Sequence, residues 1–590
     1  MRVFEANISL QVCVFLKEFL NNISSFEIAN EKIFGKYGLI SFFENRDDFR
    51  ELKNRVSMVA ISTVAEPDRA EYGDFQTNQE LTNRVAKYLV KENISPDIII
   101  EPTCGKGNFI IAALSNFKTI KKVVGIEIYK PYVWETKFNI LNFLLANPVN
   151  NKLEIAIKHC NIFDFDFKNI SKQFPNEKIL IIGNPPWVTN AKLGRLNSSN
   201  LPEKSNFKNQ SGLDAMTGKG NFDIAEYITL MLLDAFHTHD GYLALLIKNS
   251  VIKNIVFDQK EKKYKIGKIE KYCIDSKKEF NVSVEASLLC CRLNTNPSVE
   301  CNEYDMYSLE KKTSFGWLNA KFVSNLADYI EKQEIDGVSP FEWRQGIKHD
   351  CSSVMELERV NEHFINKLSE KVELEEGLIY GLLKSSDLKD RVIKNSRKQV
   401  IVTQTKVGQD TSFIQDLYPK TYNYLKSNIS HFQARKSNIY KGKPLFSIFG
   451  IGDYSFKPYK VAISGLYKTC NFALILPQNN KPLMLDDTCY FIGFDKIEYA
   501  VYATILLNSE TTKAFLKSIT FSDAKRVFTK DILMRLDLLR VANLISRTEI
   551  DEQIIFLNEK YSLKINLSQW DNFINEMTPK KEKQLIIFKP

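Results

Sequence analysis

The chain has 590 residues, and at roughly 100–200 residues per domain this length predicts several domains. Hydrophobic residues make up 44% of the chain and aromatic residues 12%, so large cores can form and wholesale disorder is excluded. The formal net charge of +9 favours a polyanionic partner.

The spacing of the cysteines and the length of the apolar stretches indicate the cellular compartment. Ten cysteines are scattered without a C-x-x-C pair and the six histidines do not cluster with them, so no metal site is expected. The lack of a disulfide pattern fits a reducing environment. The first apolar stretch is interrupted by Lys17 and Glu18, and no run reaches the roughly 20 apolar residues of a membrane helix. We expect a cytoplasmic protein without membrane attachment.

Three regions follow one another along the chain. Residues 1–70 carry a helical apolar stripe and are expected to form a helical extension. In residues 71–298, short apolar runs alternate with amphipathic segments, which predicts an open α/β sheet. The expected strands are 98–100, 123–126, 153–157, 179–182, 243–247 and 286–291. Residues 189–221 have no periodicity, and loops of that length are usually functional or disordered. Residues 299–590 are aromatic, basic and turn-rich, and we expect a separate α+β domain there.

Ligand-type residues follow the first two expected strands. The first strand leads into EPTCGKGNF (101–109), where Gly105 and Gly107 permit a sharp turn and a close approach to a ligand. A G-x-G pair can equally be a tight turn, and neither the full dinucleotide pattern nor a P-loop is present. The second strand ends in VGIEI (124–128), where Glu127 can accept hydrogen bonds from both ribose hydroxyls.

The third and fourth strands end in the same manner. HCNI (159–162) places a polar and then an apolar residue where they could meet an adenine ring, and the fourth strand ends in IIGNPPW (181–187). Ligands of open α/β sheets bind at the carboxyl ends of the strands. Four such ends therefore indicate a nucleoside site.

EPTCGKGNF, VGIEI and IIGNPPW, in this order, resemble the motifs of gamma-ordered S-adenosylmethionine-dependent DNA methyltransferases that act on adenine N6. YGDFQT (72–77), GNFDIA (220–225) and GYLALLI (241–247) resemble further motifs of that group. The resemblance covers about residues 70–295. It implies a Rossmann-like class I methyltransferase sheet with a C-terminal α+β target-recognition domain. The chain departs from the family at Asn161, where Asp is usual and Asp164 or Asp166 could substitute, and at Asn78, where Pro is common.

The resemblance also implies site residues. The implied cofactor is S-adenosylmethionine, and the residues implied to bind it are Thr77, Glu101, Thr103, Gly105, Gly107, Glu127, Ile128, Asn161, Ile162 and Asn184. The implied catalytic residues are Asn184, Pro185, Pro186 and Trp187. Thr77 could instead merely cap a helix over residues 79–90.

In the family mechanism, two hydrogen-bond acceptors bind the N6 amine of the target adenine, whose lone pair is conjugated into the ring. The Asn184 side-chain oxygen and the Pro185 carbonyl accept its two N–H groups, which favours a pyramidal nitrogen. Trp187, expected to be exposed, and Phe280 stack on the flipped-out base. Phe280 could also be an ordinary core residue.

Basic and aromatic residues interleave between residues 431 and 468, and a second basic group follows near residue 525. Basic side chains bind phosphates and aromatic rings stack on bases, so this part is expected to bind DNA. A β-rich core with a wet basic rim is the alternative. Segments of this region resemble the target-recognition domains of the same methyltransferases. The expected DNA-binding residues are Arg435, Lys436, Lys457, Lys460, Lys525 and Arg526.

The resemblance therefore implies a site-specific adenine-N6 methyltransferase of a restriction–modification system. It would act as a monomer on double-stranded DNA and protect host DNA from a separately encoded endonuclease. The alternative is the same chemistry on RNA adenine or on a protein glutamine. A fused nuclease is disfavoured because only about 70 residues precede the α/β region. A DNA-binding module with a dead site is disfavoured by the intact NPPW.

Overall fold

A computed structural model of the chain describes residues 6–57, 76–148, 153–189, 223–361, 363–524 and 526–578. The chain divides into two compact units, Met1–Phe322 (unit 1) and Val323–Pro590 (unit 2). Nearly all of the expected loop 189–221 lies outside the described residues. Among the described residues, no helix combines the length and the apolar character needed to cross a membrane.

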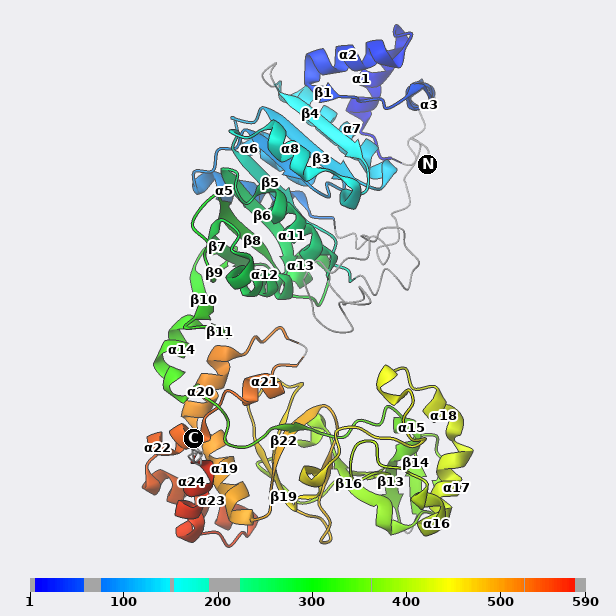
Figure 1. The fold of residues 1–590 in the computed structure, drawn as a ribbon. Helices are drawn as coiled ribbons and strands as arrows, with labels where there is room; N and C mark the ends of the chain where they lie inside the picture. The colour runs from blue at the N-terminus through cyan, green and yellow to red at the C-terminus, as the bar shows by residue number, and fades with distance from the viewer. Residues whose placement is uncertain are drawn as a thin grey trace, which may run out of the picture. The chain divides into compact units, whose positions relative to one another are not determined.

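Unit 1 is built on one mixed sheet, which has eleven strands in the described part of the chain (Figure 1). The strand order is β1-β4-β3-β2-β5-β6-β8-β7-β9-β10-β11. The bounds are β1 Leu39–Ile40, β2 Ile98–Glu101, β3 Lys122–Glu127, β4 Glu154–His159, β5 Ile179–Gly183, β6 Gly241–Lys248, β7 Ile266–Cys273, β8 Ala286–Leu293, β9 Glu300–Asp305, β10 Lys311–Leu318 and β11 Lys321–Val323.

The strands that carry the predicted motifs are parallel neighbours in the middle of this sheet. The pairs β4–β3, β3–β2, β2–β5 and β5–β6 are all parallel, and β8 then runs antiparallel to β6. Every residue of β2 and β5 is buried, which is why both segments are continuous apolar runs rather than alternating ones. The carboxyl ends of β2, β3, β4 and β5 therefore meet at one edge of the sheet.

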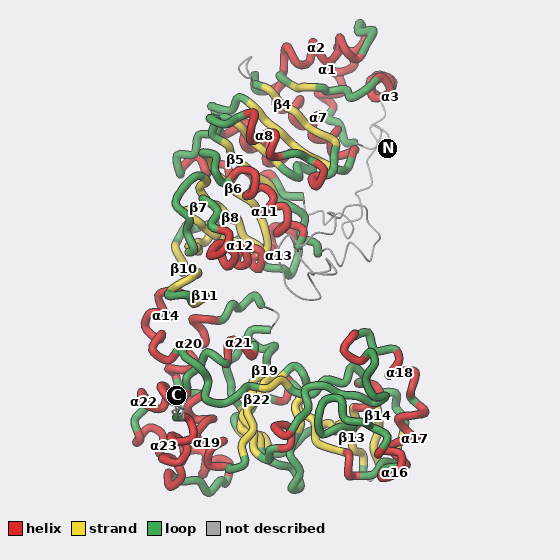
Figure 2. Tube along the Cα trace, in the orientation of Figure 1, coloured by secondary structure: helices red, strands yellow, loops and turns green. Residues whose placement is uncertain are grey.

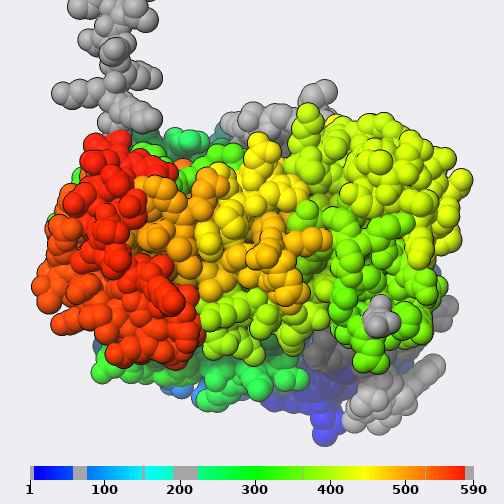
Figure 3. Space-filling model, turned by 90° about the horizontal axis from the view of Figure 1, so that it is seen from below, coloured from blue at the N-terminus to red at the C-terminus, as the bar shows by residue number. Residues whose placement is uncertain are grey.

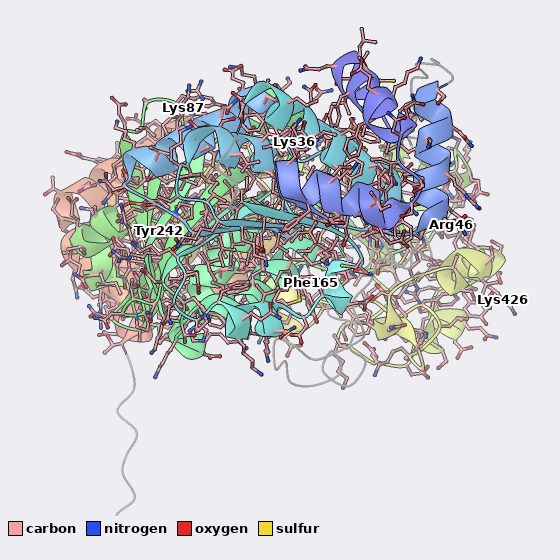
Figure 4. The ribbon with its side chains drawn as sticks, turned by 90° about the horizontal axis from the view of Figure 1, so that it is seen from above. Lys36, Arg46, Lys87, Phe165, Tyr242 and Lys426 are labelled. Carbon is pink, nitrogen blue, oxygen red and sulfur yellow. The ribbon has the colours of Figure 1, made fainter. Side chains whose placement is uncertain are left out.

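Helices cover both faces of the sheet (Figures 1 and 4). Figure 4 shows Lys87 on α5 at one side of the sheet and Phe165, just before α8, at the other. The bounds are α1 Leu10–Asn21, α2 Phe26–Tyr37, α3 Arg46–Ser57, α5 Gln79–Lys91, α6 Asn108–Asn116, α7 Lys130–Ala146, α8 Phe167–Gln173, α11 Ile224–Phe236, α12 Asn249–Lys262, α13 Ser276–Phe280 and the 3-10 helix η2 Ile162–Asp164.

The N-terminal helices belong to unit 1 rather than forming a separate extension. Leu16, Ile33 and Leu52 are buried in the same hydrophobic core as the central strands. The short strand β1 pairs in parallel with β4 and lengthens the sheet at that edge. At the other end, β9, β10 and β11 continue the sheet past residue 298. The observed division after Phe322 therefore differs from both boundaries expected from the sequence, at 70 and at 298.

Unit 2 has an α+β architecture with two sheets. One sheet has the order β12-β22-β19-β20-β17 and the other β15-β14-β13-β18-β16-β21. The bounds are β12 Arg344–Gln345, β13 Glu356–Val360, β14 His363–Asn366, β15 Lys371–Val372, β16 Ile379–Leu383, β17 Val392–Ile393, β18 Lys398–Ile401, β19 Tyr459–Ser464, β20 Ala473–Ile475, β21 Met484–Leu485 and β22 Cys489–Phe494.

Helices gather at the two ends of unit 2, with strands between them (Figure 2). In Figure 3 the C-terminal helices, in red, and the yellow-green segment that includes α16 to α18 lie at opposite ends. The longer helices are α14 Leu326–Lys332, α16 Phe413–Leu417, α17 Pro419–Ser427, α18 Ile429–Gln433, α19 Ile497–Leu507, α20 Glu510–Ile519, α22 Leu538–Leu544, α23 Arg547–Tyr561 and α24 Trp570–Met577; shorter ones are α15 Ser352–Met355 and α21 Lys530–Leu533.

Candidate functional site

The glycine turn between β2 and α6 has the geometry that only glycine permits without strain. Gly105 and Gly107 have φ angles of 52° and 81°, in the left-handed region. A Cβ atom on Gly105 would lie 2.8 Å from the Gln76 side chain, and one on Gly107 would lie 2.8 Å from Thr136 Cγ2. The turn therefore brings bare backbone to the carboxyl edge of the sheet.

A carboxylate on the next strand holds this turn. Glu127 Oε2 accepts a hydrogen bond from the Gly105 N–H at 2.9 Å, and its Oε1 accepts one from the Tyr129 N–H at 2.8 Å. A carboxylate has about four lone-pair sites, so these two bonds leave capacity for ligand hydroxyls. Glu127 thus organises the loop as well as lining the pocket.

The pocket at this edge has a volume of about 870 Å³. Of the predicted cofactor residues, it is lined by Thr77, Glu101, Thr103, Gly105, Glu127, Ile128, Ile162 and Asn184. It is also lined by residues that the sequence reasoning missed: Gln76, Asn108, Tyr129, Tyr132, Cys160, Phe163, Ile224 and Ile228. Tyr132 and Phe163 follow the predicted strand ends closely, and aromatic residues at those points were the signal that could have identified them.

Glu101 supplies a buried carboxyl group to the pocket. Its side chain is 2% exposed, and its Oε2 atom has no hydrogen-bond partner among the described residues. Burial raises the pKa of Glu101 well above its ordinary value, and the charge of Glu127 adds to this rise. A buried carboxylate in this state favours a ligand that brings positive charge or hydrogen-bond donors.

Asn161 has a local structural role in this structure. Its side-chain oxygen accepts a hydrogen bond from the Phe163 N–H at 3.1 Å and so caps the short helix η2. Its neighbour Ile162, rather than Asn161, lines the pocket. The alternative Asp166 caps α8 through the Asn169 N–H. The segment that follows β4 therefore contributes apolar surface to the pocket through Ile162, and caps for the helices η2 and α8.

The NPPW segment follows β5 and borders the same pocket through Asn184 and Pro186. Asn184 Nδ2 donates to Thr77 Oγ1 at 3.2 Å, which orients the amide. Thr77 is not the cap of α5, because Asn78 performs that task through the Leu81 N–H at 2.8 Å. An Asn at position 78, in place of the Pro common in the family, thus has a structural explanation.

Trp187 is buried, in contrast to the exposed position expected from the sequence. It is 6% exposed, and its Nε1 atom donates to the Leu246 carbonyl at 3.2 Å. Its ring packs edge-on against Phe280, with ring centroids 5.0 Å apart and planes inclined by 71°. The two aromatic residues are therefore neighbours, although 93 positions separate them in the sequence.

An ion pair that the sequence reasoning missed supports the far end of the NPPW segment. Lys248 Nζ lies 2.5 Å from Asp223 Oδ2, and both side chains are largely buried. Burial raises the pKa of Asp223, although Lys248 opposes the rise. The Ile224 N–H donates to the Val188 carbonyl at 2.9 Å, directly after Trp187. This ion pair therefore links the end of β6 to the NPPW segment, residues 184–187, which is the candidate catalytic loop.

Comparison with known proteins identifies the family. No protein-family model matches the chain. The type II methyltransferase M.NspV of Nostoc sp. is 41% identical over 482 residues, which are 81% of this chain and 99% of that protein. This chain belongs to the type II methyltransferases of restriction–modification systems. As a DNA methyltransferase of this kind it uses S-adenosylmethionine, and the lining of the pocket in unit 1 fits that cofactor.

A solved structure supports the fold of the methyltransferase. The type IIL restriction–modification enzyme MmeI, determined in complex with DNA, has a TM-score of 0.51 and 12% sequence identity to this chain. The match covers 85% of this chain and 71% of MmeI. The Rossmann-like class I sheet predicted from the sequence is therefore confirmed.

In unit 2 of the methyltransferase, the predicted DNA-binding residues differ in their surroundings. Lys436 is exposed, Lys457 pairs with Asp495, and Arg526 donates to the Asp487 carbonyl at 2.6 Å. Lys525 lies outside the described residues. These residues do not form one patch of free cations.

Lys460 and Arg435 are corrections to the prediction. Lys460 is 1% exposed and donates to the Lys457 carbonyl at 2.7 Å, so its ammonium group does not face a phosphate. Arg435 donates to the carbonyl oxygens of four residues, Phe432, His349, Ser447 and Leu445. Its guanidinium also lies 3.7 Å from the centroid of the Tyr440 ring. Arg435 therefore stabilises the conformation of the loop that follows α18.

Proposed function

We propose that this methyltransferase modifies N6 of an adenine that it flips out of double-stranded DNA, and that it belongs to the gamma-ordered group. The observation that carries the proposal is the NPPW segment at the end of β5, which borders the same pocket as the glycine turn. The motif order supports the gamma assignment, because the glycine turn precedes NPPW along the chain.

The pocket in unit 1 has suitable partners for each part of S-adenosylmethionine. The Glu127 carboxylate can accept hydrogen bonds from ribose hydroxyls, and Ile162 can contact the adenine ring. The carboxyl group of Glu101 can accept hydrogen bonds from the amino group of the methionine part of S-adenosylmethionine. When bound, S-adenosylmethionine supplies a methyl group on a positively charged sulfur.

Asn184 and Pro185 prepare the target amine. The adenine amine is a weak nucleophile because its lone pair is delocalised into the ring. Two acceptors that each take one N–H favour a pyramidal nitrogen with a localised lone pair. The Asn184 side-chain oxygen and the Pro185 carbonyl provide these acceptors, and the hydrogen bond from Asn184 to Thr77 fixes the amide beforehand.

The buried pair Trp187 and Phe280 lies beside the proposed target-base site. Extracting a base costs a few kcal/mol, and stacking on an aromatic ring returns roughly 1–3 kcal/mol. Both rings are in contact with each other and both adjoin the candidate catalytic loop. In the proposed complex the edge-on pair opens to receive the base.

We propose unit 2 as the target-recognition part, which is expected from the sequence to span residues 299–590. We further propose that the enzyme acts as a monomer and protects host DNA from a separately encoded endonuclease. Its exposed and partly exposed cations, with Lys436 and Lys457 among them, support contacts to the DNA backbone.

The proposal is tested by substitution of Asn184. Asn572 serves as the matched control, because its side chain is exposed on α24. In Asn184→Ala we expect kcat for methyl transfer to DNA to fall by about 100-fold or more, the scale of losing one preorganised polar group. Asn572→Ala should transfer at the rate of the unmodified protein. If Asn184→Ala keeps full kcat, the amide does not act on the amine.

Base flipping has its own readout. We expect 2-aminopurine, placed at the target position of a duplex, to become strongly fluorescent when the enzyme binds, because the base leaves the stack. Tight binding to that duplex without any gain in fluorescence would contradict the flipped-out base.

A further inference from the structure

Unit 2 contains an open pocket of about 1260 Å³ that lies outside the methyl-transfer site. Four separate parts of unit 2 form it. They are the loop after β12 with the start of β13, the end of β16, the loop after α18, and the turn between β21 and β22. Its charged or titratable lining residues are Lys348, His349, Asp350, Glu356, Lys384, Arg435, Lys436, Asp486 and Asp487.

The charges in this pocket are balanced, which distinguishes it from a phosphate site. Four of the lining residues are Lys or Arg, and four are Asp or Glu. A site built to hold phosphate needs an excess of cations, because carboxylates repel the phosphate oxygens. A mixture of donors and acceptors instead suits the edges of bases, which present both kinds of group in the major groove.

We propose that this pocket reads the edge of a G·C base pair in the recognition sequence. Lys348 and Lys436 would donate to guanine O6 and N7, and Asp350 would accept from the cytosine amino group. The inference rests on the proposed function of the chain as a sequence-specific DNA methyltransferase, and it names residues that determine its specificity.

The inner charged groups of the pocket form ion pairs and make up its floor. Glu356 is 4% exposed; its Oε1 atom accepts a hydrogen bond from Lys384 Nζ at 2.6 Å, and its Oε2 atom forms an ion pair with Lys367 Nζ at 3.0 Å. Burial alone would raise the pKa of Glu356, but these lysines hold it below its ordinary value. His349 is buried, and burial lowers its pKa to about 4, so it is neutral at pH 7. The floor is thus a fixed polar surface.

The backbone that carries Lys348 is held from several sides. Lys348 and Phe449 exchange two N–H to carbonyl hydrogen bonds, each 2.8 Å long. The Tyr440 hydroxyl donates to the Lys348 carbonyl at 3.2 Å, and Arg435 Nη1 donates to the next carbonyl, that of His349. Arg435 therefore helps to hold the backbone that carries Lys348. A rigid backbone presents the neighbouring side chains in a fixed geometry.

The side chains at the rim are available for a ligand. Lys348 Nζ and Asp350 Oδ2 form an ion pair at 3.6 Å, beyond hydrogen-bond length, and the two side chains are 37% and 32% exposed, so both can still reach a ligand. Lys436 is exposed, and among the described residues it has no ion-pair partner. These three side chains provide donors and an acceptor at the mouth of the pocket.

The test begins with the sequences that the full-length enzyme modifies. Genomic DNA from a host without methyltransferases is incubated with enzyme and S-adenosylmethionine and then sequenced by a single-molecule method that detects modified bases. We expect one motif that contains at least one G·C pair. A motif made only of A·T pairs would overturn the inference. Modification of cytosine instead of adenine would overturn the proposed target base and leave the pocket test intact.

The variants Lys348→Ala and Asp350→Asn are then compared with Lys560→Ala, a control on α23 in a different part of unit 2. We expect both pocket variants to lose about 10-fold or more of their activity on the motif and to gain modified sites that differ from it at one G·C pair. Lys560→Ala should keep the motif and the rate.

An equal loss at every sequence with an unchanged motif would overturn the inference and assign these residues to phosphates. Full activity with an unchanged motif would also overturn it. The unfolding transition of unit 2, which contains the pocket, is measured by differential scanning calorimetry and checks that each variant is folded. If Lys348→Ala fails that check, Lys348→Gln and Asp350→Asn carry the same test with less change of side-chain volume.

Discussion

At the scale of single residues, this enzyme buries polar and charged groups that a sequence pattern places on its surface. Lys460 lies in the apolar strand β19 and is almost fully buried, and burial lowers its pKa to about 7. In an unfolded chain the pKa of lysine is about 10.4. Between these two values the unfolded chain binds a proton that the folded chain does not.

The free energy of unfolding should therefore rise with pH between about 7 and 10.4, by up to about 1.4 kcal/mol per pH unit from this group. Below pH 7 both states are protonated and the contribution of Lys460 stays constant. We expect Lys460→Met to remove this part of the pH dependence in urea titrations, and the partly exposed Lys457→Met to keep it. Identical profiles for Lys460→Met and the unmodified protein would show that the ammonium group is hydrated.

A second prediction at this scale concerns Phe280. If its ring stacks on the flipped-out base, Phe280→Ala should lower kcat/KM for DNA by about 10-fold, because such a stack contributes roughly 1–3 kcal/mol. Affinity for S-adenosylmethionine, measured by calorimetry, should change little. Phe280→Tyr should restore the activity, since it retains the aromatic face. A loss that Tyr does not restore would indicate a packing role only.

At the scale of elements, helix α7 connects the N-terminal segment to the glycine turn. On one side, the buried Lys137 donates to the carbonyl groups of Ser41 and Phe42. On the other side, Thr136 Oγ1 donates to the Gly105 carbonyl at 2.6 Å, and Asn139 Nδ2 donates to the Lys106 carbonyl at 3.0 Å. The turn that approaches the cofactor is thus fixed by a helix, not by the strand alone.

Thr136 is accordingly a positioning residue for the cofactor site. Thr136→Val keeps the side-chain volume and leaves the buried Gly105 carbonyl without its donor, which costs about 1–3 kcal/mol. We expect the Kd for S-adenosylmethionine to rise by about 10-fold. Thr136→Ser retains the hydroxyl and should bind nearly as well as the unmodified enzyme. Equal affinities for the Val and Ser variants would contradict the role of this hydrogen bond.

The central strands and the motifs at their ends could be predicted, because strands buried on both faces are continuous apolar runs. Strand β7 was missed because charged residues such as Lys268 and Lys271 interrupt its pattern. The support of the glycine turn by Thr136 was missed because a contact across 31 positions leaves no local signal. Lys460 was misassigned because burial inside β19 depends on the other strands of its sheet.

At the scale of the whole molecule, the two compact units should unfold as separate cooperative transitions. S-adenosylmethionine should raise the temperature of the transition of unit 1 only, because a ligand stabilises the unit that binds it. Leu16 belongs to the core of unit 1 and Trp343 is fully buried in unit 2. We expect Leu16→Ala to lower the transition that responds to the cofactor and Trp343→Ala to lower the other.

Differential scanning calorimetry of the full chain measures both transitions. An effect of Leu16→Ala on the transition that does not respond to S-adenosylmethionine would contradict the assignment of the N-terminal helices to unit 1. A single transition that shifts as a whole would show that the units are not independent.

The most direct test of the central claim is the chemical identity of the methylated base. DNA is incubated with the enzyme and isotope-labelled S-adenosylmethionine, digested to nucleosides and analysed by mass spectrometry. The arrangement of Asn184, Pro185 and the pocket predicts that the label appears in N6-methyldeoxyadenosine and that Asn184→Ala lowers the rate of its incorporation by about 100-fold or more. Label in a methylated deoxycytidine, with none in deoxyadenosine, would contradict the proposed reaction.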